Sequence, residues 1–261
     1  MEGLTNKDTQ LHDERFAGIQ PEDIILKVDG KEPAGVDDAV SMISGEAGTR
    51  VTVTIKRGDE VIDITLNRAK IETESVTYSV LDGHPDIGYI GISSFIKNTD
   101  EDFKDAVKAL ESQGCDKFII DLRDNGGGLT DSSIEIADYL LPECRIMSEN
   151  TKAGAETVYN SKASSADLDM VILVNENTAS ASEILTAALQ DNKAGTVIGT
   201  KTYGKGVTQI LHPFDDGTAV KVTSTEYFRP SGKTVHGVGI TPDIEAEGDE
   251  VMDAALKELE D

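Results

Sequence analysis

The feature that most constrains the fold of this chain is a buried strand that leads through a tight turn into a helix, and it occurs twice. The apolar run Met170 to Val174 precedes the polar turn Asn175 to Ala179 and a helical pattern from Ser180 to about Asp191. The segment Phe118 to Leu122, predicted to be a buried strand, precedes the glycine-rich loop Arg123 to Gly128 and a further helical pattern. Strands that alternate with helices in this way predict an α/β domain. Sites in open α/β sheets collect at the carboxyl ends of strands, so the two turns are the first places to look for chemistry.

Further strands and helices surround these two units. The sequence predicts a strand over Ile87 to Ile92, helices over Asp100 to Gln113 and Thr130 to Leu141, a strand-rich segment over Thr196 to Phe228, and a short acidic helix over Glu250 to Leu259. Pro142 is expected to stop the second of these helices, because its ring cannot continue a helix.

An earlier part of the chain, residues 22 to 67, has the pattern of a small β-rich unit. The sequence predicts a strand over Asp23 to Val28, a helix over Val36 to Ile43, and two strands joined by a turn at Arg57 to Asp59. The change from short strands to long helices near residue 70 predicts two domains, residues 1–68 and residues 69–261.

The charge of the chain excludes some classes of partner. Its 49 acidic and 24 basic residues give a formal net charge of −25 at pH 7. Nucleic acid and anionic membranes would be repelled, so we expect no nucleic-acid partner and interpret the charge as an aid to solubility. No run approaches the roughly 20 apolar residues that span a bilayer, and the start MEGLTNKDTQ lacks the layout of a signal peptide. Membrane association is therefore expected only through a segment that this chain does not contain.

Cysteine and histidine are few and scattered. Cys115 and Cys144 do not form a CxxC pair, and the four histidines lack the HExxH spacing of zinc sites. The sequence therefore predicts no metal and no other cofactor. It leaves the redox state of the two cysteines open, because a single disulfide fits the sequence as well as two free thiols do.

Ser180 stands where the predicted strand turns into the helix. A serine at such a turn exposes its hydroxyl, and the free N–H groups at the start of the helix can stabilise a developing oxyanion. The alternative interpretation is an ordinary N-cap, a position at which serine is among the favoured residues. The segment alone leaves both interpretations open.

Lys205 lies between Gly204 and Gly206, which allow the backbone to approach another segment closely. A lysine can act as a general base when loss of solvent disfavours its charged form. The alternative is a solvated lysine in a turn, since lysine is seldom fully buried.

The loop Asp121 to Gly128 can present backbone N–H groups to an anion at the end of a strand. It is also glycine-rich in the manner of nucleotide-binding loops. It lacks both the GK[ST] sequence and the GxGxxG spacing that those loops need, so a nucleotide site has little support.

These three segments together resemble one family, the carboxyl-terminal processing proteases. The resemblance lies in the runs Asn177 to Ile184, Lys201 to Gln209 and Asp121 to Gly128, and in Arg229 to Lys233 and Gly237 to Asp243 near the end. It extends over roughly residues 17 to 245. It implies an α/β fold in which a crotonase-like or Clp-protease-like catalytic domain follows a small PDZ domain.

The resemblance also implies roles for individual residues. Ser180 would be the nucleophile and Lys205 the general base that accepts its proton. Gln209 would orient the lysine by hydrogen bonding, from the same face of the segment if that segment is helical.

An oxyanion hole is implied as well. Its donors would be the N–H groups of Ala181 and of Gly126 or Gly127. The residues expected either to support these groups or to have a purely structural role are Ser182, Glu183, Asp191 and Thr202.

The implied activity is that of a serine endopeptidase that forms an acyl-enzyme intermediate. The implied substrates are proteins or peptides whose small or apolar C-termini bind the PDZ domain by strand addition. Only about a dozen residues separate Gly3-Leu4 from Ala17-Gly18, so we expect this PDZ domain to be incomplete at its N-terminal side. The family implies export to the bacterial cell envelope, as a periplasmic or secreted protein, and a homo-oligomer is compatible with the sequence.

Two other functions fit the sequence. A binding module could keep the fold and cleave nothing, although the presence of Ser180, Lys205 and Gln209 argues against it. An acyl-CoA enzyme of the crotonase type would also use an oxyanion hole, but it gives no reason for a serine and a lysine at this spacing. Fluorophosphonate labelling compared with Ser180→Ala, together with an assay of acyl-CoA turnover, would separate the three.

Overall fold

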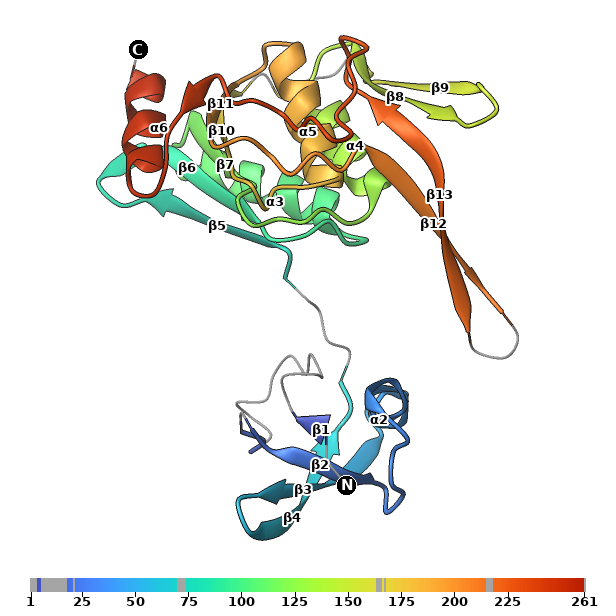
Figure 1. Ribbon diagram of the computed structural model, residues 1–261. Helices are drawn as coiled ribbons and strands as arrows, with labels where there is room; N and C mark the ends of the chain where they lie inside the picture. The colour runs from blue at the N-terminus through green and yellow to red at the C-terminus, as the bar shows by residue number, and fades with distance from the viewer. Residues whose placement is uncertain are drawn as a thin grey trace. The chain divides into compact units, whose positions relative to one another are not determined.

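The structure of the protein is a computed structural model, which describes residues 4–5, 18–20, 22–69, 74–162, 166, 168–214 and 218–260. Its chain divides into two units, Met1–Thr73 and Glu74–Asp261 (Figure 1). Each unit has a hydrophobic core of its own, and each is described by itself.

The first unit is an antiparallel sheet with one helix. Its strands lie in the order β1-β2-β3-β4, with the bounds β1 Leu4–Thr5, β2 Ile24–Val28, β3 Arg50–Arg57 and β4 Glu60–Asn67, and its helix α2 covers Val36–Ile43. Alternate residues of β3, namely Val51, Val53 and Ile55, are buried and share a core with Ile25 of β2 and Ile43 of α2. The hairpin and the helix predicted for this unit are confirmed.

The prediction of an incomplete PDZ domain concerns the segment between Gly3 and Ala17. Within it the structure describes β1, which pairs antiparallel with β2. The rest of the segment lies outside the described residues.

The second unit is built on a six-stranded sheet with the order β14-β11-β10-β7-β6-β5. The strands are β5 Val76–Leu81, β6 His84–Ile92, β7 Lys117–Asp121, β10 Asp169–Val174, β11 Thr196–Gly199 and β14 Ile244–Glu245. All neighbours are parallel except β5 and β6, which are antiparallel. The carboxyl ends of β7, β10 and β11 therefore meet at one edge of the sheet.

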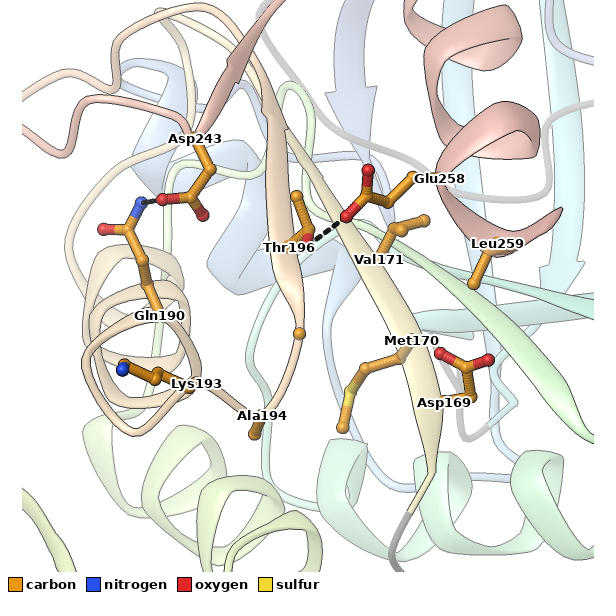
Figure 2. Close-up of a pocket in the computed structure, with 11 residues that line it drawn as sticks. Asp169, Met170, Val171, Gln190, Lys193, Ala194, Thr196, Asp243, Glu258 and Leu259 are labelled. Atoms are coloured by element: carbon orange, nitrogen blue, oxygen red, sulfur yellow. Dashed lines mark hydrogen bonds between the residues drawn. The ribbon is translucent and has the colours of Figure 1, made fainter. Parts of the chain in front are cut away.

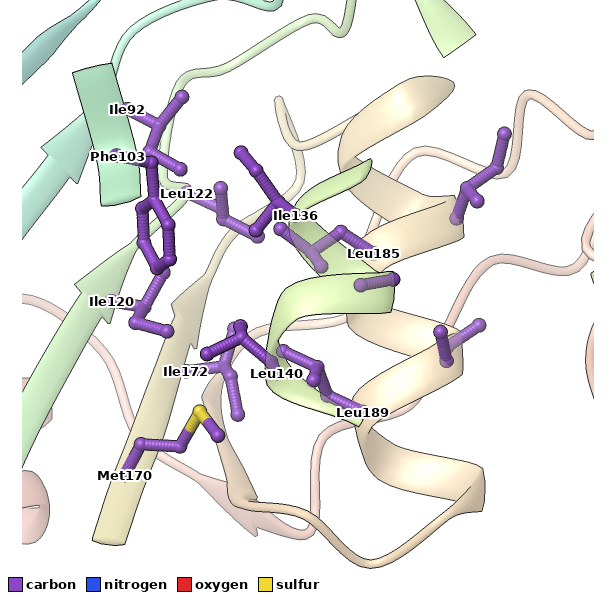
Figure 3. Close-up of a cluster of buried hydrophobic side chains, with 14 of the residues drawn as sticks. Ile92, Phe103, Ile120, Leu122, Ile136, Leu140, Met170, Ile172, Leu185 and Leu189 are labelled. Carbon is purple, nitrogen blue, oxygen red and sulfur yellow. The ribbon is translucent and has the colours of Figure 1, made fainter. Parts of the chain in front are cut away.

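Helices cover both faces of this sheet. They are α3 Thr99–Ser112, α4 Thr130–Leu140, α5 Ala181–Asp191 and α6 Glu250–Glu260. The first three pack on one face, where Ile120, Ile172 and Leu185 share a core (Figure 3). Helix α6 packs on the other face, where Ile119 and Val251 share a second core. Because both faces are covered, the central strands β7 and β10 are apolar at their inner positions, Phe118 to Ile120 and Met170 to Val174. The predicted α/β class is confirmed. None of the helices in the described part of the chain has the length and apolar character to cross a membrane.

A second sheet of this unit has four antiparallel strands in the order β12-β13-β8-β9. Its strands are β8 Arg145–Thr151, β9 Glu156–Asn160, β12 Val207–Pro213 and β13 Ala219–Phe228. Strands β12 and β13 confirm the strand-rich segment expected after Thr196. The sequence does not predict β8, because three consecutive residues, Ile146 to Ser148, are buried and the alternation that marks a half-buried strand is lost.

Candidate active site

Ser180 lies at the turn between β10 and α5, as the sequence predicts, and is the N-cap of that helix. Its backbone has φ 60° and ψ −117°, a conformation that residues with a side chain rarely adopt and that costs on the order of 1–3 kcal/mol. The Ser180 N–H donates to the Glu183 carboxylate over 2.9 Å, which helps to hold this conformation. The Ser180 side chain is half-buried. A serine on a strained strand-to-helix turn is typical of a nucleophile.

Glu183 connects the Ser180 turn with the Lys205 segment. Its side chain is fully buried (0% exposed). One carboxylate oxygen accepts the N–H groups of Ser180 and Lys205, each over 2.9 Å. The other accepts the Thr202 hydroxyl over 2.6 Å and the Gly204 N–H over 2.7 Å. Because main-chain N–H groups can only donate, the carboxylate holds the two segments together as the acceptor for four donors.

Two glycines let the Lys205 segment lie against residues 235–239. The Gly204 carbonyl accepts the Gly237 N–H over 2.9 Å. A Cβ atom at Gly206 would overlap the His236 nitrogen, so only glycine fits there. The close approach of the backbone that was predicted for Gly204 and Gly206 is confirmed.

The Lys205 side chain is half-buried, and its main chain is fixed at both polar atoms. Its amine has no hydrogen-bond or ion-pair partner among the residues that the structure describes. In particular, no hydrogen bond joins the amine to the hydroxyl of Ser180 in the described part of the chain. The structure thus brings the two main-chain segments together through Glu183.

Gln209 lies on a strand rather than on a helix. It belongs to β12, whose pairing with β13 shifts register between Thr208 and Gln209. A helical turn from Lys205 to Gln209 is therefore wrong for this segment, because pairing with β13 extends the chain. The Gln209 amide is exposed and donates to the Thr223 hydroxyl over 3.4 Å. The structure does not bring this amide into a hydrogen bond with Lys205.

The expected oxyanion-hole donors differ in their hydrogen bonding. The N–H groups of Ala181 and Gly126 have no acceptor among the residues that the structure describes. The Gly127 N–H donates to the Asn125 Oδ1 over 2.9 Å. Gly127 itself packs so closely that an added Cβ would lie 2.8 Å from the Ser180 Cβ. Gly127 therefore brings the glycine loop against the Ser180 turn.

Asn125 is a site residue that the sequence analysis misses. It is fully buried, and its carbonyl accepts the Ala179 N–H over 3.0 Å and the Ser182 hydroxyl over 2.9 Å. Its side-chain amide donates to the Ile92 carbonyl over 2.8 Å. Asn125 therefore fixes the glycine loop to the Ser180 turn. An asparagine directly before a run of glycines, at a strand end, is the sequence signal that could have indicated this role.

Asp191 lies at the far end of α5 from Ser180, about 16 Å along an 11-residue helix. It forms an ion pair with Arg229 and accepts the Ser231 N–H over 3.0 Å. Burial opposes its charge, but the hydrogen bonds from Arg229 and Ser231 prevail and lower the pKa of the Asp191 carboxyl. Unlike Ser182, Glu183 and Thr202, Asp191 has no hydrogen bond or ion pair to the Ser180 turn or the Lys205 segment among the described residues, and it instead fixes the turn after β13.

A cavity of about 860 Å³ opens at the carboxyl ends of β7, β10 and β11. In its wall the Asp121 carboxylate binds Arg123 over 2.5 Å and accepts the Tyr89 hydroxyl over 2.7 Å. Burial and the hydrogen bond to Asp121 raise the pKa of Tyr89 to about 12. The charged residues that line the cavity are Asp121, Asp124, Glu176 and Glu247 on the acidic side and Arg123 and Lys201 on the basic side. Because acidic residues outnumber basic ones in its lining, this cavity favours positively charged groups over anions.

A second cavity, of about 370 Å³, lies at the opposite ends of the strands, where β10 and β11 begin and α5 ends (Figure 2). Its Glu258 carboxylate accepts the Thr196 hydroxyl over 2.8 Å, and its Asp243 carboxylate accepts the Gln190 amide over 3.0 Å. These acidic groups already have structural partners. Because β10 runs away from this cavity toward Ser180, the cavity does not lie at the Ser180 turn.

Both units of the chain contain residues that match known protein families. The model of peptidase family S41 matches residues 86–246, and a PDZ-domain model matches residues 14–57. The chain belongs to peptidase family S41. Its first unit is PDZ-like, and its second unit carries the S41 peptidase fold, as the resemblance to carboxyl-terminal processing proteases predicts.

Two S41 relatives called probable CtpA-like serine proteases come from staphylococci. The one from Staphylococcus saprophyticus is 36% identical over 237 residues, which is 88% of this chain and 48% of the relative. The one from Staphylococcus aureus is 38% identical over 234 residues, which is 87% of this chain and 47% of the relative. The chain therefore spans about half the length of the curated relatives it matches.

Solved structures agree with the family. The photosystem II D1 C-terminal processing protease has a TM-score of 0.60 and 29% identity, over 89% of this chain and 65% of that one. A lipoprotein from Streptococcus agalactiae has a TM-score of 0.62 over 72% of this chain and 70% of that one, and at 18% identity it supports the fold alone.

Proposed function

We propose that this chain is a serine endopeptidase in which Ser180 is the nucleophile and Lys205 the general base. The observation that carries the proposal is the buried Glu183 carboxylate, which accepts N–H groups from both residues and so keeps their backbones in one site. Membership of family S41 and the naming of two relatives as serine proteases support it.

The chemistry follows from a neutral amine. Lys205 takes the proton of the Ser180 hydroxyl as Oγ attacks the scissile carbonyl, and it returns that proton to the leaving amine as the acyl-enzyme forms. A water molecule then attacks the ester, again with the lysine as base, and releases the second product. Rotation of the Lys205 side chain, whose amine is unpartnered in the described part of the chain, is the motion that we expect to complete the dyad.

Stabilisation of the oxyanion is assigned to two main-chain donors. Ala181 is the first residue of α5, so its N–H is aimed outward from the positive end of the helix. The Gly126 N–H on the neighbouring loop is the second donor that we assign, since both groups lack an acceptor within the described residues. The Gly127 N–H already donates to the Asn125 side chain. We therefore assign Gly127 a packing role, because its lack of a side chain lets the loop lie against Ser180. Gln209 would have to leave Thr223 before it could orient Lys205.

The substrates that we propose are proteins or peptides recognised through small or apolar C-terminal residues. The PDZ match supports recognition by strand addition, and one structural relative is named as a C-terminal processing protease. In this proposal residues 1–68 recognise the substrate and residues 69–261 cleave it. Titration of the chain with a fluorescent peptide that ends in a free carboxylate tests the recognition of C-termini. Equal affinity for the same peptide with its C-terminal carboxylate converted to an amide would contradict it.

The proposal includes a location at the bacterial cell envelope, outside the cytoplasm, which rests on the resemblance to carboxyl-terminal processing proteases. Cell fractionation of the source bacterium followed by immunodetection tests this location. Protein found only in the cytoplasmic fraction would contradict it.

Labelling with a fluorophosphonate and digestion of casein test the activity. Ser180→Ala should abolish both, and Lys205→Met, which removes the amine and keeps the side-chain length, should abolish them as well. Matched controls on exposed positions of α3, Ser112→Ala and Lys108→Met, should remain active. No cleavage by the unchanged protein would favour a silent binding module, and acyl-CoA turnover that survives Ser180→Ala would favour a crotonase-type enzyme.

A further inference from the structure

We propose that Tyr227 is a positioning residue that locks the nucleophile segment and the base segment together through its phenol. This inference deepens the proposed function and rests on the Ser180–Lys205 chemistry. The role concerns geometry alone, because the phenol contacts main-chain atoms of both residues rather than the reacting groups.

The contacts of Tyr227 carry the inference. Its hydroxyl donates to the Lys205 carbonyl over 2.6 Å and to the Ser180 carbonyl over 3.0 Å. Its own N–H donates to the Gly206 carbonyl over 3.0 Å, so its main chain is fixed beside the base segment. The side chain is 2% exposed, so water does not compete for these bonds. A phenol has one proton, which the two carbonyls share.

Tyr227 and Glu183 act on opposite ends of the same two residues. Glu183 accepts the N–H groups of Ser180 and Lys205, and Tyr227 donates to their C=O groups. Four polar atoms of the two backbones are therefore held by two buried side chains. With both backbones fixed in this way, the remaining freedom of the dyad lies in the side-chain torsions of Ser180 and Lys205.

The protonation state of the phenol suits this role. Burial, with a further contribution from Glu183, raises the pKa of Tyr227 above its ordinary range. The hydroxyl therefore stays a donor at the alkaline pH at which a lysine becomes neutral. A phenolate could not donate to the two carbonyls, so the pair of hydrogen bonds from Tyr227 to Ser180 and Lys205, the Tyr227 latch, depends on the proton that burial retains.

Tyr227→Phe tests the proposal, because it removes one oxygen and leaves the shape of the core unchanged. We expect kcat for peptide cleavage to fall at least tenfold with KM within about twofold, since a small misplacement of reacting groups costs rate rather than binding. The rate of fluorophosphonate labelling should fall by the same factor. The cleavage and labelling rates are both measured well below the melting temperature of the variant. If the hydroxyl only stabilised the fold, its removal would leave kcat unchanged at that temperature.

The matched control is Tyr159→Phe, which removes a tyrosine hydroxyl that donates to Glu149 over 2.9 Å in β8 and β9. This variant should keep kcat within about twofold. Substitution of Tyr227 by 4-aminophenylalanine, which keeps a donor at the same position, should restore most of the rate. If Tyr227→Phe does not fold, the 4-aminophenylalanine variant decides between the outcomes. A kcat near that of the unchanged protein supports the latch, and a kcat as low as that of Ser180→Ala overturns it.

Failure of the latch can be told apart from failure of the proposed function. If Ser180→Ala or Lys205→Met still cleaves peptides at full rate, the proposed chemistry is wrong and the latch fails with it. If both are inactive while Tyr227→Phe keeps more than about a tenth of the original kcat, the dyad stands and the latch alone is overturned.

Discussion

Replacement of Glu183 by glutamine tests whether one buried carboxylate holds the proposed nucleophile and base segments together. Glutamine has nearly the same shape, but its amide places an NH₂ group where the carboxylate has an acceptor. If the NH₂ group faces Ser180 and Lys205, two N–H donors meet a third donor. If it faces Thr202 and Gly204, the hydroxyl can rotate and accept, but the Gly204 N–H stays unpaired.

The less costly orientation still lowers the free energy of unfolding by about 3–5 kcal/mol. One unpaired buried N–H costs about 1–3 kcal/mol, and loss of the charge weakens each of the two remaining hydrogen bonds by about 1 kcal/mol. In a domain the size of the second unit, each kcal/mol lowers the melting temperature by about 2–4 °C. We therefore expect Glu183→Gln to melt about 6–20 °C below the unchanged protein.

Thermal unfolding followed by far-UV circular dichroism measures this effect, with peptide cleavage assayed on the same samples. The control is Glu258→Gln, a half-buried carboxylate in α6 that accepts a hydrogen bond from the Thr196 hydroxyl over 2.8 Å. Its amide oxygen can keep that bond, so it should lower the melting temperature by less than about 3 °C. A Glu183→Gln protein that melts within about 2 °C of the unchanged one and cleaves peptides normally would refute the reasoning.

Three further predictions concern the base, the glycine loop and an ion pair. Lys205→Arg should be inactive because its guanidinium stays protonated and cannot accept the proton of the Ser180 hydroxyl; peptide cleavage by this variant at the rate of the unchanged protein would contradict the role proposed for Lys205. Gly127→Ala should lower the rate of fluorophosphonate labelling at least about tenfold, because the new Cβ would lie 2.8 Å from the Ser180 Cβ at a φ of +100°, and normal labelling would count against the packing described. The pKa of Asp191 is lowered because hydrogen bonds from Arg229 and from Ser231 outweigh the opposing effect of burial. Its charge therefore stabilises the fold above the unfolded pKa of about 3.9, and that contribution is lost as the pH falls through the lower folded value. Asp191→Asn should thus unfold at lower urea concentration at neutral pH, with the difference disappearing in acid; a difference that persists in acid would be inconsistent with this assignment.

The sequence by itself determined the layers of the second unit and the position of the strand-to-helix turn at Ser180. Strands buried on both faces are rich in apolar residues, so the runs Phe118 to Ile120 and Met170 to Val174 indicate β7 and β10 directly. The glycines on either side of Lys205 likewise reveal a close approach, because a side chain there would collide with the backbone of residues 235–239. These signals are local, and each is complete within a few neighbouring residues.

Only the tertiary structure decided what surrounds Ser180 and Lys205. Pairing with β13 made the segment of Gln209 a strand, a choice that depends on residues in another part of the chain. Glu183, Asn125 and Tyr227 acquire their roles through hydrogen bonds to backbone atoms that any residue type would supply. Since a main-chain N–H or C=O has no signature in the sequence, such partners become identifiable only when the packing of the sheet and helices brings them within reach.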